Sequence, residues 1–248
     1  MNDAYKGKKG GGRLKTQQGN VIFSLEDLAD RVGIRPARAL VEENVPSDDL
    51  LLGQLIAPEP ARKYQVIWGY LSSIAAERSA VPLCLPSRDY VGLELSRGII
   101  CLEEAKDHVG ERMKGGRIFV SGSAGDYLGQ EMSGGGIIAP GCRDYAFRNM
   151  RGGFGVITGN AGKFLCLGNS GGRVIVRGNC GERAGWLMHS GSMRIQKDAG
   201  DYLGLLMSGG KIIVKGQAGK RAGWRKKGGT IIAGSFGPEA ANDLLGLD

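Results

Sequence analysis

Apolar and polar residues alternate in short runs that recur along most of the chain. Gly171–Trp186 reads GGRVIVRGNCGERAGW, and Gly209–Trp224 repeats it as GGKIIVKGQAGKRAGW. Alternation with a period of two is the pattern of a β-strand. The second glycine of each GG-like pair recurs every 18 or 19 residues, at Gly116, Gly135, Gly153, Gly172, Gly191, Gly210 and Gly229. A short fixed period of this kind predicts a repeat architecture.

Each repeat predicts one coil of a β-helix. A single short strand cannot bury its apolar face, whereas stacked coils complete both the hydrogen-bond ladder and the core. The glycines are expected at corners where φ is positive or the backbone approaches closely. The fold class is therefore expected to be mainly β, a right-handed parallel β-helix of about eight coils over residues 90–235, with about 19 residues per coil. The first of these units, starting near Arg97, matches the pattern only weakly.

The pattern changes before residue 90. Residues 1–20 are polar and basic, which predicts a flexible tail. Helical patterns follow at 24–33, 37–43 and 61–78, and the last of these carries one apolar face. Between the second and third patterns, residues 50–56 form an apolar run. Residues 21–89 are therefore expected to form a helical capping region and linker, because an open end coil needs a cover. The C-terminal segment, 236–248, contains EAANDLLGLD, a helical candidate for covering one end.

Strand alternation also sends one residue of each coil away from the core. Successive coils place nearly all apolar residues in this outward column: Ile100, Phe119, Ile138, Val156, Ile175, Arg194, Ile213 and Ile232. An exposed apolar stripe of this length marks an interaction surface. We therefore predict a partner interface at Phe119, Ile138, Val156, Ile175, Arg194, Ile213 and Ile232. The stripe is covered either by the terminal segments of the chain or by another subunit.

The formal net charge of +8 favours acidic partners. Basic residues gather on the corners of the last coils, at Arg183, Lys220, Arg221, Arg225, Lys226 and Lys227. They form either a solvated face or a site for an acidic partner or a polyanionic ligand. Aspartates and glutamates are interspersed with the basic residues, and the few aromatic residues form no evident stacking motif. Nucleic acid is therefore not the expected partner.

No set of residues assembles a recognisable active site. His108 and His189 lack the spacing of zinc ligands, and the glycines at 122–125 recur as corners rather than as a phosphate-binding loop. Asp126, Asp144 and Asp201 occupy equivalent corners and are expected to cap them. We predict no catalytic, cofactor-binding or metal-binding residue in this chain.

The five cysteines lack CxxC spacing, which favours reduced thiols in a cytoplasmic protein. No apolar run reaches the length of a membrane span, and no signal peptide is evident. The expectation is a soluble, cytoplasmic chain.

The repeats also resemble a known family. The units GRIFVSGSAGDYLGQEM at 116–132, GRVIVRGNCGERAGWLM at 172–188 and GKIIVKGQAGKRAGW at 210–224, with GGTIIAG at 228–234, are similar to the GxxGxxxG-repeat β-helix family. That family includes the C-terminal domain of the glutamate synthase large subunit and the β-helix subunit of formylmethanofuran dehydrogenase and of its formyltransferase/hydrolase relatives. The phrases AGDYLG, ERAGW and GTIIAG resemble the formylmethanofuran dehydrogenase member more than the glutamate synthase domain. The resemblance covers residues 97–234 and implies a structural part without catalytic residues.

Three functional hypotheses follow. The first is a non-catalytic scaffold subunit of a cytoplasmic multi-subunit enzyme complex in one-carbon metabolism, similar to formylmethanofuran dehydrogenase, with metals carried only by partner subunits. The second is a stand-alone subunit similar to the glutamate synthase C-terminal domain, which supports an amidotransferase assembly. The third is a polyanion-binding module that uses the late basic residues.

Overall fold

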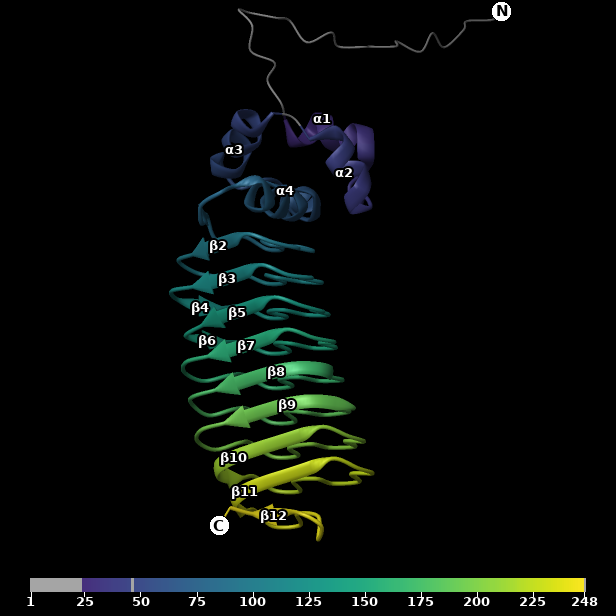
Figure 1. Ribbon diagram of the computed structural model, residues 1–248, viewed down its shortest axis with the longest axis vertical. Coiled ribbons are helices and arrows are strands. Elements are labelled where there is room, and N and C mark those ends of the chain that lie inside the picture. The colour runs from purple at the N-terminus through teal and green to yellow at the C-terminus, as the bar shows by residue number, and fades with distance from the viewer. Residues whose placement is uncertain (1–23, 46, 248) are drawn as a thin grey trace, which may run out of the picture.

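The computed structural model describes residues 24–45 and 47–247 and is a rod built from stacked coils, with helices at one end (Figure 1). In this described part the strands form a ten-stranded parallel sheet, β1-β2-β3-β5-β7-β8-β9-β10-β11-β12, and a small second sheet, β4-β6. The predicted fold class is confirmed: the protein is mainly β, a parallel β-solenoid with about 19 residues per coil. The tail predicted for residues 1–20 lies outside the described residues.

The helices include the three predicted at 24–33, 37–43 and 61–78, and a further one over the apolar run at 50–56. They are α1 (Leu25–Val32), α2 (Arg38–Asn44), α3 (Asp48–Ile56), the 3₁₀ turn η1 (Arg62–Tyr64) and α4 (Gln65–Arg78). Ser24 caps α1, because its hydroxyl accepts a hydrogen bond from the Asp27 amide at 3.1 Å. At the other end, Gly33 follows Val32 with φ 81°. The helix expected from residue 61 begins only at Gln65, after the 3₁₀ turn.

Helix α4 is buried on nearly all sides, so the prediction of a single apolar face was incomplete. Ile67 and Trp68 are fully buried, but so are Ser72 and Ser73. The reason is its position between the other helices and the first coil (Figure 1). The Ser72 hydroxyl accepts a hydrogen bond from the Gly92 amide at 2.9 Å, and the Ser73 hydroxyl donates one to the Leu93 carbonyl at 2.7 Å. These serines therefore satisfy backbone groups that the end coil leaves open.

The strands of the main sheet follow the repeat, one to a coil. They are β1 (Leu83–Leu85), β2 (Ile99–Leu102), β3 (Arg117–Val120), β5 (Gly136–Ala139), β7 (Phe154–Ile157), β8 (Ser170–Val176), β9 (Ser190–Ile195), β10 (Lys211–Ala218), β11 (Thr230–Phe236) and β12 (Leu245–Gly246). The small sheet contains β4 (Ser123–Ala124) and β6 (Gly141–Cys142).

Both ends of the sheet extend beyond the predicted β-helix. Strand β1 lies at the end of the 21–89 region, where we expected only helices and a linker, and pairs with β2. At the other end, the helix expected in EAANDLLGLD is wrong. The segment is irregular and ends in β12, which pairs with β11 through Ile232 and Leu245. The last coil presents an open row of backbone hydrogen-bonding groups, and an extended segment satisfies part of that row where a helix could not.

The interior is filled from three sides of each coil. One side is the strand, which contributes two buried residues such as Ile118 and Val120. A second side is a ladder of bridged small residues, at Ala105, Ala124, Cys142, Ala161, Cys180, Ala199 and Ala218. The third side is a turn that contributes pairs such as Leu128 and Met132. Stacking therefore produces one continuous core along the rod.

The corner aspartates cap the neighbouring coil, as predicted. The Asp126 carboxylate accepts a hydrogen bond from the Asp144 amide at 2.9 Å, and the Asp144 carboxylate accepts one from the Lys163 amide at 2.7 Å. Asp201 accepts one from the Lys220 amide at 2.8 Å. Each carboxylate thus satisfies a backbone amide one coil further along.

Replacing Gly172 by Val is expected to destabilise the solenoid by about 1–3 kcal/mol or more. Gly172 has φ 77°, and a Cβ built there would lie 2.6 Å from Cε of Met150. The free energy of unfolding, measured in denaturant, checks this against Arg177→Val on the exposed surface, which is expected to change stability by less than about 0.5 kcal/mol. Equal effects of the two substitutions would contradict the strain at this corner.

Candidate functional surfaces along the rod

The outward column predicted from alternation is continuous in the structure. Register pairs its members from coil to coil: Phe119, Ile138, Val156, Ile175, Arg194, Ile213 and Ile232. Arg194 is exposed and the others are partly exposed. Side chains stacked above and below cover each one in part, and the outer face of the column remains open to solvent.

Ile100 does not belong to this column, and its assignment there was wrong. It pairs with Ile118 and is fully buried, whereas Cys101 pairs with Phe119 and takes the outward place. The interval between these two coils is 18 residues rather than 19, which shifts the alternation by one position. The column continues through Cys101 to Cys84 at one end and reaches Leu245 at the other.

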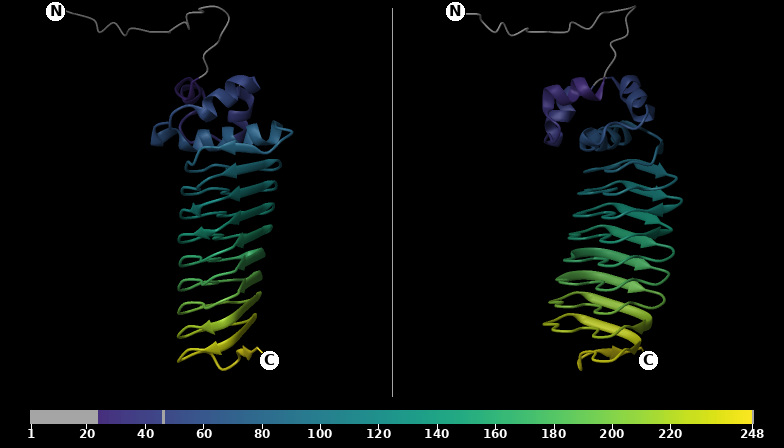
Figure 2. Two further views of the ribbon diagram at one scale, coloured as in Figure 1. Left: turned by 90° about the vertical axis from the view of Figure 1, so that its left-hand side faces the viewer. Right: turned by 180° about the vertical axis from the view of Figure 1, so that it is seen from behind.

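The described segments leave the middle of this face uncovered. Helix α4 packs on β1 and β2, and β12 packs on β11. Figure 2 shows the helices at one end of the rod and the C-terminal strand at the other, with neither lying along the sheet. Among the described residues, the terminal segments therefore do not cover the column between β3 and β10.

The open face is hollowed around β7 to β10. One hollow is lined by Phe154, Val156 and Ile175, and an adjoining one by Ile175, Ile213 and the cations Arg173, Arg194 and Lys211. Phe154 is 36% exposed, a large fraction for a phenyl side chain. This part of the face is therefore apolar at its centre and positively charged at its edge.

The predicted basic residues gather at the last coils, but several are neutralised by the C-terminal segment. Glu239 pairs with Lys220 at 3.0 Å and with Arg221 at 2.7 Å. Lys226 pairs with Asp243 at 2.5 Å, and its side chain is only 5% exposed. Hydrogen bonds from Lys220 and Arg221 hold the pKa of Glu239 below its ordinary value. These three cations are therefore already paired within the chain.

The other three basic residues have different surroundings. The Arg183 guanidinium lies over the rings of Phe164, Trp186 and Tyr202, at 5.5–6.0 Å from their centroids. The guanidinium of Arg225 lies 4.7 Å from the centroid of Trp224. Lys227 is exposed. The six residues thus line the corners of the last coils without converging on one site.

An aromatic ladder runs along the turns and was not predicted from the sequence. The rings of Tyr90, His108, Tyr127, Tyr145 and Phe164 stack from coil to coil with centroid separations of 4.6–5.1 Å. All five residues have φ between 58° and 62°. Their recurrence directly after the corner position, as in GDYLG, is the signal that could have revealed the ladder. Because the ring faces cover each other, the ladder stabilises the stack rather than offering a flat binding surface.

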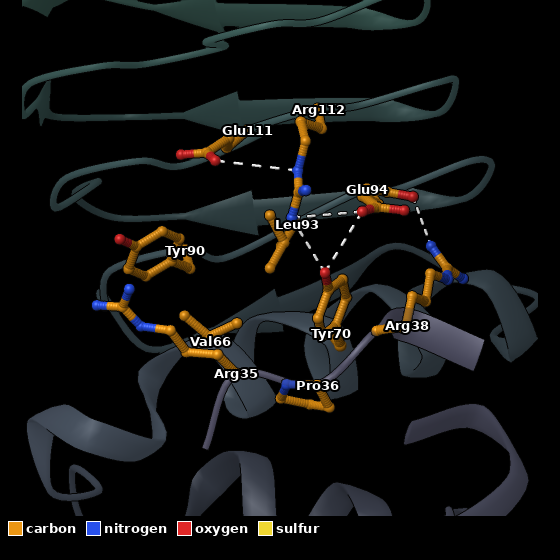
Figure 3. A pocket seen from close by; sticks show the side chains of 11 residues that line it. Arg35, Pro36, Arg38, Val66, Tyr70, Tyr90, Leu93, Glu94, Glu111 and Arg112 are labelled. Carbon is orange, nitrogen blue, oxygen red and sulfur yellow. Dashed lines mark hydrogen bonds and ion pairs between the residues drawn. The ribbon is translucent and has the colours of Figure 1, made fainter. Parts of the chain in front are cut away.

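A charged cleft of about 630 Å³ lies where the helices meet the first coils (Figure 3). Arg112 donates a hydrogen bond to the Tyr70 hydroxyl at 3.0 Å and pairs with Glu94 at 3.4 Å. Lys114 pairs with the same carboxylate at 2.8 Å, and Arg38 of α2 donates to the Glu94 carbonyl. These contacts tie the helical cap to the first two coils. Within the cleft, Glu94 is thus paired with Arg112 and Lys114, and Glu111 is paired with His108.

Replacing Glu94 by Gln is expected to lower the stability of the folded chain by about 1–2 kcal/mol at neutral pH. Burial alone would raise the pKa of Glu94, but Lys114 and Arg112 outweigh burial and hold it below the ordinary value. Because the folded-state pKa is lower than the unfolded value of about 4.3, the stabilisation is complete above that pH. It is lost as the pH falls through the folded-state pKa.

Melting temperatures measured between pH 7 and pH 3, roughly the range that spans carboxyl titration, test this expectation. The difference between the wild type and Glu94→Gln should shrink toward the acid end. Parallel curves for the two proteins would show that Glu94 does not carry this part of the pH dependence.

The two histidines lie in separate local environments. His108 pairs with Glu111 at 2.6 Å, and His189 contacts the Ser208 hydroxyl at 2.7 Å. Within residues 24–45 and 47–247, no three His, Cys, Asp or Glu side chains are grouped as metal ligands. Cys142, Cys166 and Cys180 are buried, and burial raises the pKa of the Cys142 thiol to about 12.

The fold and its open face define the chain as a parallel β-solenoid protein with a helical cap. No protein-family model matches the chain, and no curated protein matches it. In the described part, the helices are all too short or too polar to span a bilayer.

Proposed function

We propose that this chain is a non-catalytic scaffold subunit of a cytoplasmic multi-subunit enzyme complex, of the kind represented by the β-helix subunit of formylmethanofuran dehydrogenase. The repeat units at 116–132, 172–188 and 210–224 supply the resemblance to that protein. Metals or other cofactors of the complex then belong to partner subunits, and this chain contributes a rigid surface on which they assemble.

The observation that carries the proposal is the open outward column. Phe119, Ile138, Val156, Ile175 and Ile213 place an apolar side chain on all but one of the coils from β3 to β10, on a face that the described segments leave uncovered. Ile232 continues the column on β11. Fully burying an aliphatic side chain contributes about 1.5–3 kcal/mol, whereas a solvated one contributes nothing. A partner that covers several coils would gain most of its binding energy here.

The charges around the column indicate the chemistry of such a partner. Arg173, Arg194 and Lys211 border the hollow that contains Ile175 and Ile213. A partner surface with apolar side chains at its centre and carboxylates at its rim would complement it. The aliphatic stem of Arg194 can lie along the apolar surface while its charge reaches the rim.

Purification of the tagged full-length chain from its native source tests the proposal. A stoichiometric complex with a molybdenum or tungsten protein, or with an amidohydrolase-like subunit, is the expected result. Flavin and iron–sulfur partners would instead support the assembly similar to glutamate synthase, and bound nucleic acid would support the polyanion-binding hypothesis.

The purified chain by itself is expected neither to hydrolyse formyl amides nor to use glutamine, since no acid–base pair or nucleophile stands out among its residues. Turnover by the isolated chain that a single substitution abolishes would refute the scaffold function.

A further inference from the structure

Two cysteines lie side by side at the head of the outward column. Strands β1 and β2 are parallel, and their register pairs Cys84 directly with Cys101. Directly paired residues of neighbouring parallel strands lie about 4.8 Å apart and project from the same face of the sheet. A disulfide joins Cα atoms that are roughly 4.4–6.8 Å apart, so the separation of this pair lies within the range that the bond spans.

The pair is reachable from solvent. A cleft of about 730 Å³ opens over it, lined by Cys84, Cys101, Pro86, Glu103 and Ser121 among others. Cys84 is exposed and Cys101 is partly exposed. The remaining cysteines, Cys142, Cys166 and Cys180, are buried in the solenoid core. Only the pair on β1 and β2 therefore combines proximity with access among the cysteines of the chain.

We propose that Cys84 and Cys101 form a dithiol modification site that reacts with low-molecular-weight disulfides and closes an intramolecular disulfide. The exposed Cys84 thiolate attacks one sulfur of the small disulfide, whose second half leaves as a thiolate and takes up the proton lost by Cys84. Cys101 then loses its proton, attacks Sγ of Cys84 in the mixed disulfide, and releases the other half as a second thiol. One small disulfide is reduced to two thiols, and the two cysteines are oxidised to one bond.

The order of attack follows from the surroundings of each thiol. Burial raises the pKa of the Cys101 thiol, and the neighbouring Cys84 raises it further. Cys101 is thus the less reactive sulfur toward a reagent in solution. It becomes effective once a mixed disulfide forms on Cys84, because the second step is then intramolecular.

The bond would join the first two coils at the end that carries the helices. Strand β1 contains only three residues and contacts both β2 and α4. A covalent link to β2 would hold this edge in place, and the oxidised chain is expected to melt at a higher temperature than the reduced chain. The pair lies at the end of the outward column, beyond Phe119, and the inference does not depend on the proposed scaffold function.

Glutathione disulfide is the probe that tests the site. The full-length chain is incubated with mixtures of glutathione and glutathione disulfide, quenched with acid and analysed by intact mass and peptide mapping. The wild type is expected to lose two hydrogen atoms without retaining glutathione, and the cross-link should map to Cys84 and Cys101.

The two single variants provide matched controls, since each removes one thiol from a surface position. Cys101→Ser should retain glutathione on Cys84, because no second thiol is present to displace it. Cys84→Ser should gain no internal disulfide and no oxidation-dependent rise in melting temperature. Wild-type protein that keeps glutathione on Cys84 beside a free Cys101, or a cross-link that maps to another cysteine, would overturn the proposal.

Discussion

Replacing Ile175 by Asp is expected to abolish assembly with partner subunits while the solenoid itself stays folded. Ile175 stands near the middle of the outward column, between Val156 and Arg194, and lines both hollows of the open face. In the free chain the new carboxylate remains solvated near Arg173 and Arg194. In a complex it would be buried against an apolar partner surface, which costs several kcal/mol.

Copurification with the tagged variant and circular dichroism measure the two halves of this expectation. Thr158→Asp is the matched control, because Thr158 is an exposed residue directly after β7 and lies outside the column. A lowered melting temperature of isolated Ile175→Asp would indicate that the chain covers the column with its own residues. A variant that folds and assembles normally would show that the column is not an interface.

The largest loss of stability is expected from filling the core beside Phe147. Six of the eight described turns carry glycine at this position, with φ of 64–75°, but Phe147 occupies it with φ 56° and is fully buried. Its ring fills the space above Gly155, the inward strand position that other coils give to Ile137 or Val174. A Cβ on Gly155 would lie 2.2 Å from Cζ of Phe147. Gly155→Val is therefore expected to cost about 3 kcal/mol or more.

The double variant tests whether Phe147 and Gly155 compensate for each other in filling one space in the core, or whether neither position tolerates substitution. Phe147→Gly alone leaves a cavity and should cost about 3–5 kcal/mol. Combined with Gly155→Val, it recreates the pairing of glycine turn and branched strand residue found in neighbouring coils, and most of the lost stability should return. Free energies of unfolding for the two single variants and the double variant measure the coupling.

A smaller change provides the control for Gly155 itself. Gly155→Ala places only a Cβ against the Phe147 ring, whereas Gly141→Ala places one 3.4 Å from its nearest neighbour, the Asn160 carbonyl oxygen. The first is expected to be clearly more destabilising than the second. Additive losses in the Phe147–Gly155 double variant would contradict the complementarity of the two residues.

Much of the fold was predictable because its determinants are local and repeated. In each coil, the alternation of apolar and polar residues predicts the strand, and a glycine such as Gly172 marks the corner. The structure confirms the positive φ of Gly172. Repetition also revealed the outward column from Phe119 to Ile232, since alternation fixes the face of a residue once the interval between coils is known. The corner roles of Asp126, Asp144 and Asp201 followed in the same way.

Other features depend on how the residues of one coil pair with those of the next, and no local sequence pattern contains that information. The 18-residue interval before β3 buries Ile100 and turns Cys101 outward, so the Cys84–Cys101 pair emerges only from the register of β1 and β2. The aromatic ladder likewise arises from stacking of residues 18 or 19 apart.

The ends of the rod were decided by tertiary structure for the same reason. Helix α4 is buried around its circumference because it packs between the other helices and an open coil, whereas a helical pattern reports only the apolar face. The segment around Leu245 became a strand because β11 offered unpaired backbone groups. Local sequence determined the repeating coil. The edges of the stack and the pairs formed across it depended on contacts between residues far apart in the chain, whose free energy exists only once the coils have stacked.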